Sequence, residues 1–224
     1  MSKLYKQTLS FLETIKDNNN KDWFDTNKDA YLSAKANMEE FMDGVKARLN
    51  ASDVIEDFKV YRIYRDVRFS KDKTPYKTYL HGYLKRQGAE RRGGYWIGIE
   101  PGNTQIGGGF YGPEKDDLFR IRKEIEVAGD EFKLIITAPN FKKLFGGLKG
   151  EGLKTGPKGF DKEHKHVDLL RMKQFYAMRS FTNKEVLSEN FIDEVVVTLE
   201  GLRPFFDYMS DVLTTDLNGR SILK

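Results

Sequence analysis

The N-terminal part of the chain repeats apolar positions with the period of an α-helix. Residues 5–15 place an apolar side chain at helical spacing, and the polar run 18–20 ends that pattern. A second apolar stripe, from Tyr31 to Leu49 within residues 22–49, again advances by threes and fours. We therefore predict a short helix followed by a long one with Asp22 as its N-cap, each with an apolar face in the core.

The middle of the chain changes to the two-residue period of β-strands. The predicted strands are 58–64, 79–85, 95–100 and 104–110. Pro101-Gly102-Asn103 is a turn signal, so the last two strands should form a hairpin. In that hairpin we expect Trp96 opposite Gly108, with the indole ring lying over the glycine run 107–109.

Helical spacing returns after Pro113. The predicted elements are a helix around 118–125, a short helix from Asp130 to Ile136, a strand over 174–181, and a final helix that carries Phe191 to Phe206. Residues 146–164 are rich in Gly and Lys and should form an exposed loop. Thr182 and Glu185 have the spacing of a capping box.

This order of elements predicts the fold class. Successive strands in the middle, with helices at both chain ends, indicate an α+β fold with a largely antiparallel sheet. We expect a single domain over residues 1–224, because no linker composition or internal repeat interrupts the chain. The last dozen residues are expected to form a tail.

Composition narrows the cellular context. Hydrophobic residues make up 39% of the chain, enough for a packed interior. There is no cysteine, which excludes disulfides and thiolate metal sites. Residues 1–16 lack the continuous apolar region of a signal peptide, and no run of about 18 apolar residues occurs. We therefore predict a cytoplasmic protein with no membrane partner.

The net charge of +4 is unevenly distributed. Residues 62–77 hold six Lys/Arg against two Asp, and residues 142–165 hold seven Lys against three acids. Each stretch therefore carries +4, and the rest of the chain is slightly acidic. Positive charge of this kind marks two short segments as candidate contacts for an anion.

The first basic segment combines cations with aromatic rings. Residues 61–77 read Tyr-Arg-Ile-Tyr-Arg-Asp-Val-Arg-Phe-Ser-Lys-Asp-Lys-Thr-Pro-Tyr-Lys. On a strand 58–64, Arg62 would share a face with apolar side chains and need an anionic partner, because an unpaired buried charge is very costly. Pro75 prevents a helix over 70–75, so amides, a hydroxyl and several cations should converge at a bend. That combination suits a phosphate or carboxylate.

Our leading hypothesis is a binding site for a phosphate- or carboxylate-bearing small molecule, with no cofactor. The expected ligand-binding residues are Arg62, Arg65, Arg68, Ser70, Lys71, Lys73 and Lys77, joined from elsewhere by Arg122 and Lys158. If the ligand is transformed, the candidates for proton transfer are Asp66, Asp72, Tyr76 and His81. We expect no metal site, because His164 and His166 lie among lysines whose charge repels a cation.

Several motifs together resemble a known family. They are Arg62–Asp66 running into Arg68–Lys77, Asn18-Asn19 before Trp23-Phe24, Gly108–Tyr111 before Pro113, Arg122, and Pro157–Asp161. This set resembles domain of unknown function 2461, a family found in bacteria and fungi, over about residues 7–210. The family has no assigned activity, so the resemblance implies one domain across the chain and no particular reaction.

Two alternatives remain open. Cations interleaved with Tyr61, Tyr64, Phe69 and Tyr76 could follow a phosphate backbone and stack on bases, as in proteins that bind single-stranded nucleic acid. The modest net charge and the absence of a known nucleic-acid-binding motif make this partner less favoured. In the other alternative the chain is a structural or interaction module, and the arginines with Asp66 form ion pairs that fix the sheet.

Overall fold

The computed structural model describes residues 2–216 and 218–223. Its strands form a five-stranded antiparallel sheet in the order β1-β2-β3-β4-β5. The strands are β1 (Ile55–Val60), β2 (Leu80–Arg86), β3 (Gly94–Ile99), β4 (Thr104–Phe110) and β5 (Phe175–Phe181). Helices precede and follow this sheet in the chain, which confirms the predicted α+β class.

The helices of the described residues fall before, within and after the run of strands. They are α1 (Lys6–Asp17), α2 (Lys21–Thr26), α3 (Lys28–Leu49), α4 (Lys115–Thr137), α5 (Pro139–Phe145), α6 (Val167–Arg171), α7 (Asn183–Val186), α8 (Phe191–Glu200) and α9 (Arg203–Thr214). Within the described residues, none of these helices combines the length and the apolar composition needed to cross a membrane.

The chain divides into two compact units made of interleaved segments. The first unit comprises Met1–Lys85, Trp96–Ile106 and Ser180–Val197, and the second comprises Arg86–Tyr95, Gly107–Arg179 and Thr198–Lys224. Strands β2 to β5 each contribute residues to both units. The single domain expected from the sequence stays a prediction.

The long N-terminal helix expected over 22–49 is in fact two helices. Asn20, not Asp22, caps α2, because its side chain accepts a hydrogen bond from the Trp23 N–H at 3.0 Å. Asn27 then ends α2, since its backbone N–H bonds to the carbonyls of Trp23 and Phe24 and its side chain donates to Trp23. The chain restarts as α3 at the next residue.

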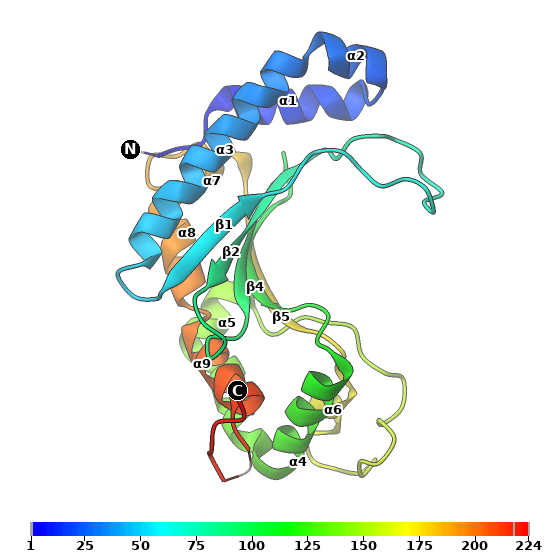
Figure 1. Cartoon of the computed structure of the whole chain (residues 1–224), viewed down its shortest axis with the longest axis vertical. Coiled ribbons are helices and arrows are strands. Elements are labelled where there is room, and N and C mark those ends of the chain that lie inside the picture. The colour runs from blue at the N-terminus through cyan, green and yellow to red at the C-terminus, as the bar shows by residue number, and fades with distance from the viewer. Residues whose placement is uncertain (1, 217, 224) are drawn as a thin grey trace. The chain divides into compact units, whose positions relative to one another are not determined.

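Helix α3 forms the core of the first unit together with α1 and β1. It contacts both elements, and its apolar stripe is buried as the spacing predicts. The sheet accepts the helix closely, because a Cβ atom at Gly82 of β2 would lie 2.0 Å from Met42 Sδ. Figure 1 shows α1 and α3 lying next to each other above β1.

The position of Trp96 differs from the prediction. A Cβ atom at Gly98 would lie 1.9 Å from the ring carbon Cη2 of Trp96, so the indole covers its own strand two residues away. The Gly108 face is covered by Leu202 and Phe206 instead. Both glycines are therefore required for close packing, but Trp96 does not lie on the run 107–109.

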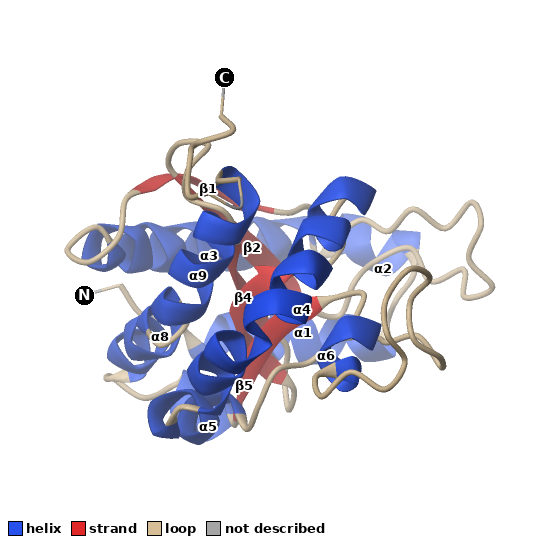
Figure 2. Cartoon of the chain, turned by 90° about the horizontal axis from the view of Figure 1, so that it is seen from below, coloured by secondary structure: helices blue, strands red, loops and turns tan. Residues whose placement is uncertain are grey.

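In the second unit the predicted break before Asp130 is only a kink. Helix α4 continues from Lys115 to Thr137, with non-helical angles at Ala128 (φ −126°, ψ 29°). Asp130 therefore lies inside the helix, where it pairs with Lys165 and His166 instead of capping a new helix. Figure 2 shows α4 beside α9, with which it packs.

The C-terminal helix expected from Phe191 to Phe206 is also divided. Helix α8 ends at Glu200 and α9 begins at Arg203, with Pro204 in its first turn. Proline lacks the N–H that would bond to the preceding turn, so it starts a helix well but cannot continue one. Beyond α9, Thr215 and Ser221 form an antiparallel bridge, while residues 217 and 224 of the predicted tail lie outside the described residues.

Candidate functional site: the loop between β1 and β2

The basic, aromatic segment forms a long loop, residues 61–79, that leaves the sheet after β1. The predicted strand 58–64 ends at Val60, and the Tyr61 N–H to His81 carbonyl bond is the last that ties this segment to β2. The two arms of the loop then pair with each other through an antiparallel bridge between Tyr64 and Tyr76. Arg62 therefore lies beyond the strand, and in Figures 1 and 2 the tip lies clear of the first unit's helices and strands.

The base of the loop is fastened to the N-terminal helices by Asn19. Its side chain donates to the Tyr76 carbonyl at 2.9 Å and accepts from the Tyr76 N–H at 3.0 Å. The Tyr76 ring is buried against Phe24, with ring centroids 4.0 Å apart. These contacts give Tyr76 a structural role, and burial raises the pKa of its hydroxyl.

Arg65 holds the two arms of the loop together. Its guanidinium donates to Asp72 at 2.5 Å and to the carbonyl and hydroxyl of Thr74. Hydrogen bonds from the Thr74 backbone and hydroxyl, followed by the one from Arg65, lower the pKa of Asp72 to about 2. Arg65 is thus satisfied by groups of its own loop.

The tip of the loop is also braced from within. Arg68 and Asp66 form a two-pronged pair, with distances of 3.0 Å and 2.6 Å, and this pair lowers the pKa of Asp66. Lys73 donates to the carbonyl of Val67 at 3.0 Å. Between these contacts the Phe69 side chain is almost fully solvent-exposed, at 97% of its surface.

Ser70 and Lys71 complete the tip. Ser70 is half-buried and its N–H bonds to the Val67 carbonyl at 3.3 Å. The ammonium group of Lys71 is exposed and makes no hydrogen bond or ion pair with any residue in the described part of the chain.

The other half of the predicted site brings together Arg62, Lys77 and His81, and the Arg62 charge contributes to lowering the pKa of Asp66. Lys77 Nζ donates to the carbonyl of Arg62 at 3.0 Å, and burial together with the Arg62 charge lowers the pKa of Lys77. Burial, and then the Lys77 charge, lowers the pKa of His81 to about 4. Over residues 2–216 and 218–223, no carboxylate forms a hydrogen bond or ion pair with any of these three side chains.

Aromatic rings surround His81. It stacks on Tyr61, with centroids 4.8 Å apart and planes inclined by 8°, and contacts Tyr79 at 5.2 Å and Trp96 at 6.2 Å. Its Nδ1 is buried without a hydrogen-bond partner among the described residues, which costs ~1–3 kcal/mol for a typical polar atom. We call Tyr61, Arg62, Lys77, Tyr79, His81 and Trp96 the cation–aromatic cluster.

A surface hollow adjoins this cluster. It has a volume of about 450 Å³ and is lined by Asn19, Arg65, Asp66, Asp72, Thr74, Tyr76, Lys77, Thr78 and Tyr79. Lys77 and Tyr79 belong to both the hollow and the cluster. The volume lies within the range of sites that hold small molecules, roughly 300–1,000 Å³.

The structure divides the residues predicted for the site. Arg62 and Lys77 come together with His81, whereas Arg65 and Arg68 point into separate internal pairs. Tyr79 and Trp96 are absent from the site predicted from the sequence, and Tyr61 is predicted only as a ring of the alternative nucleic-acid surface. The alternation in 79–83 places Tyr79 beside His81, but only the fold brings Tyr61 and Trp96 to them.

The two predicted contributors from elsewhere belong to the second unit. Arg122 on α4 donates to the carbonyls of Leu170 at 2.9 Å and Met172 at 3.2 Å, so its guanidinium binds the C-terminal end of α6. Lys158 is exposed on the loop between α5 and α6. That loop is irregular and largely exposed, as the sequence predicts, although Pro157 and Phe160 are buried.

The four candidates for proton transfer now differ in suitability. Asp66 and Asp72 are ion-paired, with their pKa lowered, so at neutral pH they are weak bases. Tyr76 is buried and holds its proton more tightly than a free tyrosine. His81 is neutral at pH 7, and its Nδ1 has no hydrogen-bond partner among the described residues, so it is the most suitable of the four.

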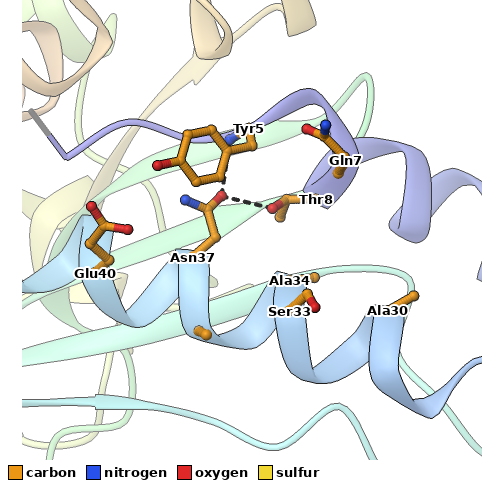
Figure 3. Close-up of a pocket in the computed structure, with 9 residues that line it drawn as sticks. Tyr5, Gln7, Thr8, Ala30, Ser33, Ala34, Asn37 and Glu40 are labelled. Atoms are coloured by element: carbon orange, nitrogen blue, oxygen red, sulfur yellow. Dashed lines mark hydrogen bonds between the residues drawn. The ribbon is translucent and has the colours of Figure 1, made fainter.

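Other features of the described residues carry less chemistry. His166 is buried over Gly129, with Nε2 3.0 Å from Asp130 Oδ1, and within the described ranges no group of three or more His, Asp or Glu could hold a metal ion. The groove between α1 and α3 is large, about 730 Å³, but its central polar group is already satisfied. Figure 3 shows Asn37 there, accepting hydrogen bonds from the Tyr5 N–H and the Thr8 hydroxyl.

Comparison with known proteins identifies a family and no closer relative. A family model described as conserved hypothetical protein DUF2461 matches residues 7–208, which include the whole loop and the hollow. No curated protein and no solved structure matches the chain significantly. The extent of the family match confirms the resemblance seen in the sequence, and the chain belongs to the conserved hypothetical protein family DUF2461.

Proposed function

We propose that this protein binds a phosphate- or carboxylate-bearing small molecule, in the cytoplasm, at the cation–aromatic cluster. The observation that carries this proposal is the grouping of Arg62, Lys77 and His81 without a carboxylate bonded to them in the described part of the chain. Like charges held together destabilise one another, and an anion placed between them removes that repulsion. The adjoining hollow offers room for the remainder of the ligand.

The chemistry of the cluster suits an anion of this size. Arg62 supplies a planar group that can bind two oxygens, and Lys77 supplies a point charge. His81, neutral at pH 7, can donate or accept one hydrogen bond without adding charge. Lys77 and His81 are partly buried, which strengthens their interactions with an anion relative to bulk water.

Binding of inorganic phosphate tests the proposal directly. We expect saturable shifts of the backbone amide signals of residues 61–62 and 77–81 in NMR titrations, measured against sodium chloride at equal ionic strength. Arg62→Gln and Lys77→Gln should each weaken binding by roughly tenfold or more, the usual effect of losing a charge-assisted hydrogen bond. Lys71→Gln removes the same charge from the exposed tip and serves as the control.

A phosphate response of the same size in the Lys77→Gln and Lys71→Gln proteins would contradict this assignment. It would mean that the loop attracts anions only through its overall charge. Equal responses to phosphate and chloride in the unmodified protein would have the same consequence, because a built site distinguishes two oxygens from a monatomic ion.

One observation favours a second candidate, the binding of single-stranded nucleic acid by the loop tip. The Phe69 ring is solvent-exposed, and the Cζ atom of Arg68 lies 6.0 Å from its centroid. Lys71 is free of partners within the described residues. Such a tip could stack on a base and contact a phosphate. Fluorescence anisotropy with a labelled oligonucleotide, at low and moderate salt, should then show salt-dependent binding that Phe69→Ser reduces.

A further inference from the structure

The hollow next to the cation–aromatic cluster has one exposed aromatic wall. Tyr79 lines it and is partly exposed, while its ring contacts His81 on the side of the cluster. Tyr76 also lines the hollow but is buried against Phe24, so its ring is already occupied. Tyr79 is therefore the aromatic surface of the hollow that a ligand can reach.

The cation next to this ring fixes where a negative group would lie. Lys77 lines the same hollow, two residues before Tyr79, and lies next to Arg62 through its hydrogen bond to the Arg62 carbonyl. A ligand whose anionic group is bound by these two cations would extend along Tyr79. Its neighbouring atoms would then meet the aromatic ring of Tyr79, in a hollow that the ion-paired side chains of Arg65, Asp66 and Asp72 also line.

The ring environment favours flat groups. Tyr79 is held in place by its 5.2 Å contact with His81, which itself stacks on Tyr61, so the ring presents a fixed surface. Stacking between two aromatic rings raises the binding constant by a factor of roughly 2 to 12 beyond the effect of apolar burial alone. A saturated ring of the same size gains only the apolar burial.

We propose that the ligand of this site is an aromatic anion, in which a phosphate or carboxylate bound by Arg62 and Lys77 is attached to a planar ring that stacks on Tyr79. This inference rests on the proposed function and narrows it to a class of ligand. Aryl phosphates, aromatic acids and nucleotides share the required chemistry, a flat π system joined to an anionic group.

Two matched probes separate ring stacking from anion binding. Phenyl phosphate and cyclohexyl phosphate have the same anionic group and rings of similar size, and only the first is aromatic. We expect phenyl phosphate to bind roughly five- to tenfold more tightly than cyclohexyl phosphate, by NMR titration of the amides of residues 77–81. Tyr79→Leu should abolish this preference, so that the two organic phosphates bind the variant with equal affinity.

The control for Tyr79→Leu is Tyr5→Leu, a more exposed tyrosine of the first unit that lines the groove between α1 and α3. It should keep the full preference for phenyl phosphate. Equal affinities of the two organic phosphates, both lost in Lys77→Gln, would overturn the aromatic ligand while leaving the anion site intact. Failure of all three phosphates to bind would overturn both. A preference for phenyl phosphate that survives Tyr79→Leu would place the stacking surface elsewhere and refute the assignment to Tyr79.

Discussion

The protonation of His81 gives the sharpest prediction about this molecule. Three aromatic rings and Lys77 surround its imidazole, and burial followed by the Lys77 charge lowers its pKa to about 4. In the unfolded chain the pKa of a histidine is close to 6.5. Between these values the unfolded state binds more protons than the folded state, so the free energy of unfolding falls as the pH falls.

The size of this effect follows from the two pKa values. At 1.36 kcal/mol per pKa unit, a change from 6.5 to about 4 corresponds to at most ~3 kcal/mol. Because the ring is only partly buried, solvent screening reduces this figure, and we expect ~1–2 kcal/mol. The stability contributed by neutral His81 is complete above pH 6.5 and declines as the pH falls towards 4.

The comparison of unmodified protein with His81→Phe isolates this contribution. Phenylalanine keeps a planar ring among Tyr61, Tyr79 and Trp96 but does not titrate. In urea unfolding, the stability of the variant relative to the unmodified protein should rise by ~1–2 kcal/mol between pH 7.5 and pH 4.5. Effects of all other titrating groups cancel in this difference.

NMR titration measures the same quantity directly. The chain has three histidines, so the imidazole signals of His81 are assigned by their absence from His81→Phe. Lys77→Met should raise the pKa of His81, and bound phosphate should also raise it by offsetting the Lys77 charge. A pKa of His81 at or above 6.5 in the unmodified protein would refute the buried, cation-flanked environment on which this reasoning depends.

Three further predictions concern the framework around the site. Asn19→Ala removes both hydrogen bonds to the Tyr76 backbone, so it should lower the free energy of unfolding by ~1–3 kcal/mol in urea denaturation. The control Asn103→Ala, on an exposed turn, should change this free energy by less than ~0.5 kcal/mol. Gly98→Ala should destabilise the folded protein by ~1–3 kcal/mol, because the new Cβ atom meets the Trp96 ring. The new Cβ atom of Gly112→Ala meets nothing within 4 Å, so this control should keep the stability of the unmodified protein. Equal melting temperatures for the two variants would contradict the packing of Trp96. Phe69→Ser should alter stability by less than ~0.5 kcal/mol, since a larger loss would show that the ring is packed in solution.

The elements that sequence patterns predicted well are those fixed by local chemistry. The strand 104–110 follows from its alternation and the preceding turn, and its bounds agree with β4. The capping box at Thr182 and Glu185 is present, with both reciprocal hydrogen bonds, because it depends on residues three positions apart. Patterns confined to a few consecutive residues carry their own geometry.

The errors lie where distant contacts or single residues override a period. The helix predicted over 22–49 runs through Asn27, yet Asn27 ends α2 by bonding back to two of its carbonyls. Arg62 reads as a strand residue by alternation, but the arms of the loop pair with each other and draw it out of the sheet. The period of apolar positions does not indicate with which other segment a stretch of backbone will form hydrogen bonds.

The sequence predicts the positive charge of the candidate site, but it does not predict which of the cations lie together. Six cations close together in sequence suggested one cluster at a bend. Asp66 and Asp72 lie at the right separations to pair with Arg68 and Arg65, so these two arginines bind residues of the loop itself and not a ligand. The bond from Tyr61 to His81 brings Arg62 beside Lys77 and His81, a contact between residues about twenty positions apart that composition cannot reveal.

The structural and ligand-binding interpretations of this loop therefore apply to different residues of it. Asn19, Arg65, Asp72 and Thr74 satisfy one another or the backbone, so they hold the loop in shape without a ligand. Arg62, Lys77 and neutral His81 are brought together by that shape, and none of the three is hydrogen-bonded or ion-paired to a carboxylate within the described residues. Burial, followed by the charge of a neighbouring cation, lowers the pKa of both Lys77 and His81, so holding a positive charge at Lys77 opposes the stability of the loop. The repulsion is consistent with a site prepared for an anion, since the bracing residues maintain the geometry that an incoming phosphate or carboxylate would otherwise have to organise.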